Sequence, residues 1–330
     1  MTKEKKIEYL ISTLLLLILF FIINTAINTG LIPRYIAGVI MLICINIILA
    51  SSLNLTVGVM GQINLGHAGF MSVGAYAAAL FLKTGINLGP LSYLISLMIG
   101  GFVALILGFL VGVPSLRLKG DYLAIITLAF GEIVRVLIEF FDFTGGAQGL
   151  GGIPTTKSFP LMYFVMVISV VVMYSLFTSR HGRGVLAIRE NEIAAEASGV
   201  DTTRAKVMTF AISAFFAGIA GAMYAQYMGI LSAKQFGFNY SIDILVMVVL
   251  GGMGSFTGSI LSATTLTLLP ELARQFADYR MIVYAIVLIL VMLYRPQGLL
   301  GREEFQISKI INFFKRKLGK GVDKDESSNH

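Results

Sequence analysis

Long apolar runs separated by short polar segments dominate the chain. Most of these runs approach the length of about 20 residues that an α-helix needs to cross a bilayer. Because backbone polar groups in lipid must find hydrogen-bond partners within the chain, runs of this kind are expected to be helices. The pattern predicts an all-α polytopic membrane protein with about ten transmembrane helices. The expected spans are residues 9–28, 35–55, 57–83, 90–113, 121–141, 160–177, 207–228, 242–259, 260–269 and 281–294.

Two stretches within this apolar pattern are rich in glycine. They read VGVMGQINLGHAGFMSVGA at residues 57–75 and GGMGSFTGS at residues 251–259. Glycines weaken a continuous helix, and irregular backbone in a membrane is tolerated where it is buried in protein or lines a wet cavity. We therefore expect two glycine-broken segments and read them as a sign of internal duplication, as in transporters with broken helices at the substrate site. Chance similarity is the alternative.

Polar side chains within the two glycine-rich stretches are the candidates for lining a translocation path. These are Gln62, Asn64, His67, Ser255 and Thr257. The alternative is that each satisfies a backbone group that the neighbouring glycines free from the helix.

A polar island at residues 179–206 separates two of the apolar runs. Its five cations, Arg180, Arg183, Arg189, Arg204 and Lys206, place it in the cytoplasm by the positive-inside rule.

Within the island, residues 192–198 predict a short helix. Asn191 is a suitable N-cap and Gly199 a suitable C′ residue, and Asp201 is suited to cap the next long helix. About two helical turns are not stable alone in water, so this helix needs a surface to rest on. Ala194 and Ala195 are small enough to let another surface approach closely. An ordinary loop on the lipid headgroups is the alternative.

The span at residues 121–141 carries ionisable groups well inside an apolar run. Glu132 and Arg135 are three residues apart, and Glu139 lies one turn further. Opposite charges at this spacing neutralise each other, which lowers the free energy needed to place them in a membrane. The intramembrane ion pair Glu132–Arg135 is interpreted as a lining of the substrate path or a clamp between helices, and a structural pair near an interface is the alternative.

Composition agrees with a membrane protein. The chain is 56% hydrophobic and 13% charged, and its net charge is +7. Because the cations cluster beside apolar runs and at the C-terminus, they fit membrane orientation and contact with anionic lipid, and nucleic-acid binding is not expected. The charge distribution predicts a transmembrane domain at residues 1–300, a basic tail at residues 301–330, and both termini in the cytoplasm.

Enzyme chemistry finds no candidate in the sequence. No G-x-x-x-x-G-K-[ST] run occurs, which is the phosphate-binding signature of many ATPases. The single cysteine, Cys44, excludes a disulfide within the chain, and the three histidines, His67, His181 and His330, are too scattered to form a metal site. We expect no catalytic residue, no metal and no cofactor.

Several motifs together resemble one transporter family. They are LRLKGDYLAIITLAFGEIVR, TGGAQGLGGIP, IRENEIAAEASGVDTTRAKVMTFA, LVMVVLGGMGSFTGS and LYRPQGLLG, which cover nearly the whole chain in this order. The chain resembles the LivM-type permeases of branched-chain amino acid ABC importers.

The resemblance implies a subunit of the bacterial or archaeal inner membrane with three kinds of partner. A LivH-type permease would complete the path, two separate ATP-binding subunits would supply energy, and an extracytoplasmic binding protein would deliver substrate. It also implies that a cytoplasmic loop docks on the ATPase, here through Glu192, Ala194, Ala195 and Gly199. The sequence EIAAEASG departs from the fuller EAA-x-x-x-G form, which leaves the exact docking contacts open.

Other transport classes remain as alternatives. Permeases for urea or short-chain amides share much of the pattern, and cargo choice rests largely with the binding protein. A secondary transporter would need an acidic group deep in the membrane, for which Glu132 is the candidate.

Overall fold

The computed structural model describes residues 3–85, 89–116, 118, 120–272 and a few positions between 285 and 301. The described residues are mainly helical and contain no strand. Four helical segments among them are long and apolar enough to cross a membrane, namely Arg34–Val59, Pro90–Ser115, Phe159–Thr178 and Thr202–Met228. The all-α prediction is confirmed, whereas ten spans stay a prediction. The expected span at residues 281–294 and the basic tail lie almost entirely outside the described residues.

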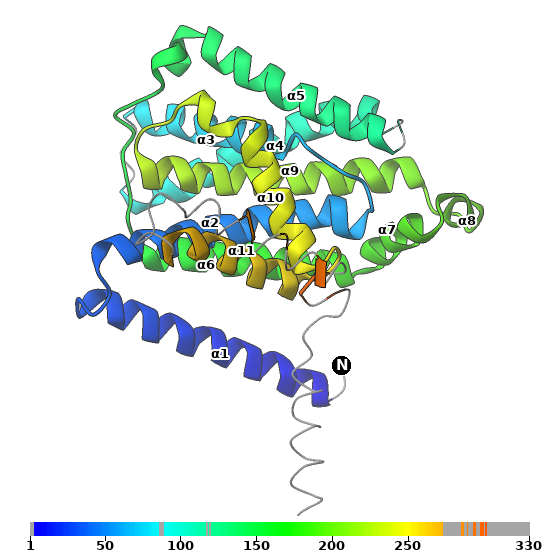
Figure 1. The fold of residues 1–330 in the computed structure, drawn as a ribbon, viewed down its shortest axis with the longest axis horizontal. Helices are drawn as coiled ribbons and strands as arrows, with labels where there is room; N and C mark the ends of the chain where they lie inside the picture. The colour runs from blue at the N-terminus through cyan, green and yellow to red at the C-terminus, as the bar shows by residue number, and fades with distance from the viewer. Residues whose placement is uncertain are drawn as a thin grey trace, which may run out of the picture.

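The long helices run roughly along one axis, and α10 crosses them steeply (Figure 1). The α-helices are α1 (Lys3–Asn28), α2 (Arg34–Asn54), α3 (His67–Lys83), α4 (Pro90–Ser115), α5 (Asp121–Phe140), α6 (Phe159–Thr178), α7 (Arg180–Glu190), α8 (Glu192–Ala197), α9 (Thr202–Met228), α10 (Phe238–Gly251) and α11 (Phe256–Leu272).

Helix α9 forms the centre of the core together with α3 and α4. Its face toward them is built from alanine and glycine, because small residues let helix backbones approach closely. A Cβ added to Gly218 would lie 2.5 Å from the carbonyl oxygen of Gly100 on α4. Gly74 of α3 also lies against Gly218. This packing leaves α9 buried along most of its length.

Helix α1 lies along the outside of this bundle (Figure 1). It contacts α6, where Phe20 stacks on Phe159 and the hydroxyl of Tyr163 donates to the Leu16 carbonyl at 2.9 Å. Large apolar side chains on the outer faces of α1, α4, α5 and α6 are exposed. Such faces suit contact with the hydrocarbon of a lipid bilayer.

Both glycine-rich stretches contain an interruption between helices. After α2 the chain forms a π-helical turn, Leu55–Val59, and then runs without helix to His67, where α3 begins. Helix α10 ends at Gly251, and α11 begins at Phe256. We call residues 55–66, which include the π-helical turn, the first interruption, and residues 252–255 the second. That the interruptions break membrane spans stays a prediction.

Candidate functional site

The polar island folds into two short helices, α7 and α8, at one end of the bundle (Figure 1). The Oγ of Ser179 accepts a hydrogen bond from the Gly182 N–H at 3.3 Å and so caps α7. Helix α7 is not among the predicted helices, although Ser179 followed by a helical run is a recognisable signal for a helix start. We call α7 and α8 together the α7–α8 unit.

The predicted short helix α8 is confirmed, and it ends one residue earlier than expected. Asn191 Oδ1 accepts the Ala194 N–H at 3.1 Å, which is the predicted N-cap. At the other end Gly199 has φ +86°. Its N–H donates to the Glu196 carbonyl and the Val200 N–H to the Ala195 carbonyl, the pattern of a Schellman motif.

The candidate docking residues of α8 divide between two faces of the helix. Ala194 and Gly199 are exposed, but Ala195 is only 4% exposed and packs against the rest of the chain. Within this chain the surface that approaches Ala195 is therefore the bundle itself, and a docking role for Ala195 stays a prediction. Ile193, which is 77% exposed beside Ala194, is not among the predicted docking residues. The available sequence signal is a large apolar residue among the charged and small residues of this stretch.

Glu192 is an anchor for α8. Its Oε1 lies 2.6 Å from the Nζ of Lys206, whose side chain is 4% exposed. Lys206 belongs to α9, so this ion pair joins α8 to the central helix of the bundle. The sequence predicts Lys206 only as one of the cations that orient the island. Its burial and its partner could not be read from the charge pattern.

At the first interruption and the start of α3, two of the three candidate path residues are buried. His67 Nε2 lies 2.8 Å from the Ser52 Oγ, and Asn64 Oδ1 accepts the Gly66 N–H at 2.9 Å. Gln62 is half-buried. The hydrogen bond of Asn64 to the Gly66 N–H fits the alternative that these residues satisfy backbone groups freed by the glycines. A path-lining role for Gln62, Asn64 and His67 stays a prediction.

In the second interruption, Ser255 is buried and caps α11. Its Oγ accepts the Gly258 N–H at 3.1 Å and lies 3.1 Å from the Thr257 Oγ1. Thr257 is half-buried. The role of these two residues in a path likewise stays a prediction.

The structure brings the two interruptions together, and no pattern in the sequence predicts this contact. Asn54 Oδ1, at the end of α2, accepts the N–H of Gly254 at 2.9 Å. Gly58 of the π-helical turn packs so closely on this amide that an added Cβ would collide with it. Asn54 is thus a connection between segments 200 residues apart.

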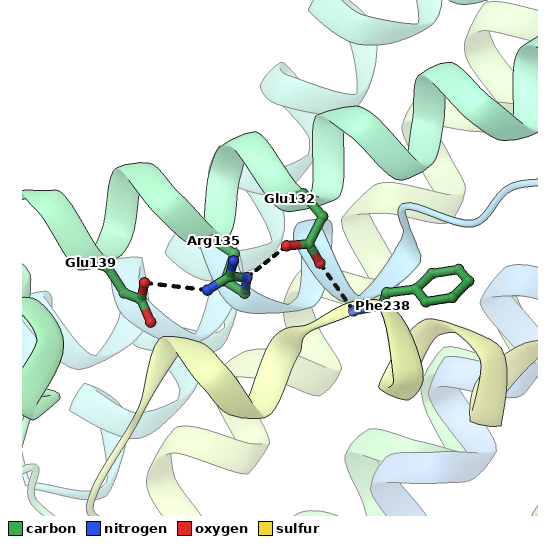
Figure 2. A network of polar contacts seen from close by, with 4 residues as sticks. All are labelled: Glu132, Arg135, Glu139 and Phe238. Atoms are coloured by element: carbon green, nitrogen blue, oxygen red, sulfur yellow. Dashed lines mark hydrogen bonds and ion pairs between the residues drawn. The ribbon is translucent and has the colours of Figure 1, made fainter.

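The ionisable groups of α5 form one network, which Figure 2 shows. Arg135 Nε donates to Glu132 Oε2 at 2.7 Å, and its Nη1 donates to Glu139 Oε2 at 3.2 Å. The predicted Glu132–Arg135 pair is therefore present. Glu132 Oε1 also accepts the N–H of Phe238 at 3.1 Å, at the first residue of α10. A carboxylate suits this position because the N-terminus of a helix carries partial positive charge. The network thus holds the start of α10 against the middle of α5.

Comparison with known proteins identifies similar chains. Residues 35–292 match the permease component family of branched-chain amino acid transport systems. The high-affinity branched-chain amino acid transport system permease protein LivM of Salmonella typhimurium is 39% identical over 291 residues, which are 78% of this chain and 68% of that protein. LivM of Escherichia coli is 38% identical over 305 residues, 82% of this chain and 71% of that protein.

A second kind of relative is more distant. The permease protein LivH of Escherichia coli is 25% identical over 289 residues, which are 78% of this chain and 92% of that protein. No solved structure matches the chain at a significant level. The family match includes both interruptions, the α5 network and the α7–α8 unit, and begins after α1.

Proposed function

Because the chain belongs to the branched-chain amino acid transport permeases, and to their LivM type, we propose that it is a subunit of an ATP-driven importer. It moves branched-chain amino acids across the inner or plasma membrane by alternating access, with both termini in the cytoplasm and lipid around its outer faces. A LivH-type permease completes the path, and the similarity of this chain to LivH supports a pair of related subunits. An extracytoplasmic binding protein delivers the substrate.

In this proposal two separate ATP-binding subunits supply the energy, and the chain itself is not an enzyme and needs no cofactor. The observation that carries the proposal is the α7–α8 unit at one end of the bundle. Its outer surface presents Ile193 and Ala194, while Ala195 and the Glu192–Lys206 pair fix α8 to the core. A surface that is both exposed and firmly attached suits transfer of movement from an ATPase to α9.

Gly199 provides a test of docking with a matched control. A Cβ at Gly199 would have no neighbour within 4 Å, so even a large side chain fits within this chain. Gly199→Trp and Gly199→Ala share the strain of a positive φ, about 1 kcal/mol, and differ in bulk. We expect Gly199→Trp to abolish uptake and ATPase binding without loss of membrane insertion, and Gly199→Ala to retain most of both. Normal uptake by Gly199→Trp would contradict the docking role.

Cysteine labelling tests the side of the membrane on which α8 lies. The native Cys44 is buried, which keeps background labelling low, and Ala194 is exposed. In sealed right-side-out vesicles, a membrane-impermeant thiol reagent should leave an Ala194→Cys variant unmodified until the vesicles are opened. Labelling from the exterior would contradict a cytoplasmic coupling surface. Position 195 is a poor choice for this experiment because its side chain is buried.

Uptake measurements test the substrate class and the energy source. In proteoliposomes containing the complete transporter, radiolabelled leucine uptake should require ATP inside and persist when an ionophore collapses ion gradients. Excess valine and isoleucine should compete, and urea or acetamide should not. Competition by urea or acetamide alone would assign the chain to the amide-type permeases, and gradient-driven uptake without ATP would indicate a secondary transporter.

A further inference from the structure

One side chain of α7 reaches both interruptions. Arg189 lies in the last turn of α7, and its Nη1 donates a hydrogen bond to the carbonyl oxygen of Gly58 in the π-helical turn. The two residues are 131 positions apart in the sequence. The contact therefore connects the α7–α8 unit directly to the end of α2, independently of the polypeptide that leads through α6.

The glycines of both interruptions make room for this arginine. A Cβ added to Gly61, in the first interruption, would lie 2.8 Å from the Arg189 Cγ. A Cβ added to Gly254, in the second, would lie 3.0 Å from its Nη1. The stem of Arg189 thus packs on one interruption and its guanidinium on the other.

Electrostatics favours a cation at this place. The last carbonyls of a helix lack partners within the helix, and the C-terminal end carries partial negative charge. The extended helix from α2 ends at Val59 and α10 ends at Gly251, both beside the segments that Arg189 contacts. A guanidinium is always charged and has five donors in a rigid fork, so one side chain can serve two helix ends at once. A lysine ammonium is a compact point charge without this planar fork, so it suits the position less well than a guanidinium.

We propose that Arg189 is the positioning residue that transmits movement of the α7–α8 unit to both interruptions. The proposal rests on the proposed function, because it needs an ATPase that moves the unit. Because Asn54 and Gly58 hold the interruptions against each other at Gly254, a displacement of Arg189 acts on both segments together. Arg180, at the start of the same helix, is an exposed cation and serves as a control.

The test compares transport with ATP hydrolysis in the assembled transporter, reconstituted in proteoliposomes with the binding protein and leucine. We expect Arg189→Gln to lower uptake at least tenfold while the ATPase subunits stay bound and hydrolysis no longer responds to the binding protein. Arg189→Lys should lie between Arg189→Gln and the unsubstituted transporter, and Arg180→Gln should match the latter. Unchanged coupling in Arg189→Gln would overturn the proposal. Parallel losses of uptake, hydrolysis and assembled complex would also overturn it, because they are expected if Arg189 only stabilises the fold.

A pair of glycine variants provides a second test that leaves Arg189 in place. Gly61 has φ +74° and Gly30 has φ +76°, but a Cβ on Gly30 would have no neighbour within 4 Å. Gly61→Ala should therefore displace Arg189 and uncouple hydrolysis from uptake, whereas Gly30→Ala, with the same backbone strain, should not. Equal behaviour of the two variants would contradict the proposal. Failure of the proposed function is distinguishable, because the unsubstituted transporter would then show no ATP-dependent uptake.

Discussion

The cations Arg135 and Lys206 show two different ways of placing charge in an apolar bundle. Arg135 has both of its carboxylate partners on its own helix, one turn to either side, and the three side chains are 25–35% exposed. Lys206 is 4% exposed and pairs with Glu192 on a different helix. The first arrangement pairs charges within α5, while the second fixes the position of one helix relative to another.

This difference predicts where a substitution will matter. Pairs within one helix contribute roughly 0.2–0.5 kcal/mol. A buried pair between elements contributes little net free energy while intact, but loss of one partner leaves a buried charge alone and is strongly destabilising. The α5 network is joined to α10 by the hydrogen bond that the Phe238 N–H donates to Glu132.

The largest effect is expected for Glu192→Ala. It leaves the buried Lys206 ammonium without its carboxylate, and we expect a loss of roughly 2–3 kcal/mol, because Glu192 itself is 32% exposed and solvent screens the pair. Hydrogen exchange should show loss of protection in α8, and uptake should fall more than tenfold. The control Glu196→Ala alters an exposed glutamate of the same helix and should change neither measurement.

The local part of the site could be predicted from sequence because its signals lie within a few residues. Asn191, Gly199 and Asp201 cap helices through their own neighbours, and Asp201 Oδ1 accepts the Arg204 N–H at 2.9 Å as expected. The spacing of Glu132 and Arg135 on a helix likewise predicts their ion pair. The alternation of apolar runs gave the all-α fold for the same reason, since helices satisfy their backbone groups within a segment.

Contacts between distant segments could not be predicted in this way. Periodicity shows that one face of a helix is apolar, but it does not identify the helix that packs there. The carbonyl of Gly58 and the amide of Gly254 carry no sequence signal for their partners Arg189 and Asn54. Charge counting treated Arg189 and Lys206 as equivalent topological signals, because their different burial depends on tertiary packing.

Lys206→Met sharpens the comparison by removing the other partner of the same pair. The methionine side chain fills most of the space of the lysine stem without a charge, and the carboxylate left behind is one that solvent already reaches. We therefore expect a loss of about 1 kcal/mol, smaller than for Glu192→Ala. Thermal unfolding of the two purified variants measures the order. A larger loss for Lys206→Met would show that the exposed carboxylate, not the buried ammonium, sets the cost.

Two substitutions of Glu132 separate its hydrogen bond from its charge. Glu132→Gln keeps an oxygen that can accept the Phe238 N–H, whereas Glu132→Leu removes the acceptor and leaves the first amide of α10 without this partner. We expect Glu132→Leu to destabilise the protein by about 1 kcal/mol and to lower uptake several-fold, with a smaller change for Glu132→Gln. Loss of uptake in Glu132→Gln equal to that in Glu132→Leu would indicate that the negative charge itself is required, as in an ion-coupled transporter.

The smallest effect is expected for Glu139→Gln. Its carboxylate contacts Arg135 at 3.2 Å within one helix, is partly exposed, and forms no ion pair with a second helix in the described part of the chain. Arg135 keeps its shorter bond to Glu132 when this partner is neutral, so the change in unfolding free energy should stay below about 0.5 kcal/mol, and uptake should remain unchanged. The same measurements applied to Glu192→Ala then provide the contrast. Equal losses of unfolding free energy in Glu139→Gln and Glu192→Ala would contradict this distinction. They would show that a pair between two helices stabilises the protein no more than a pair within one helix.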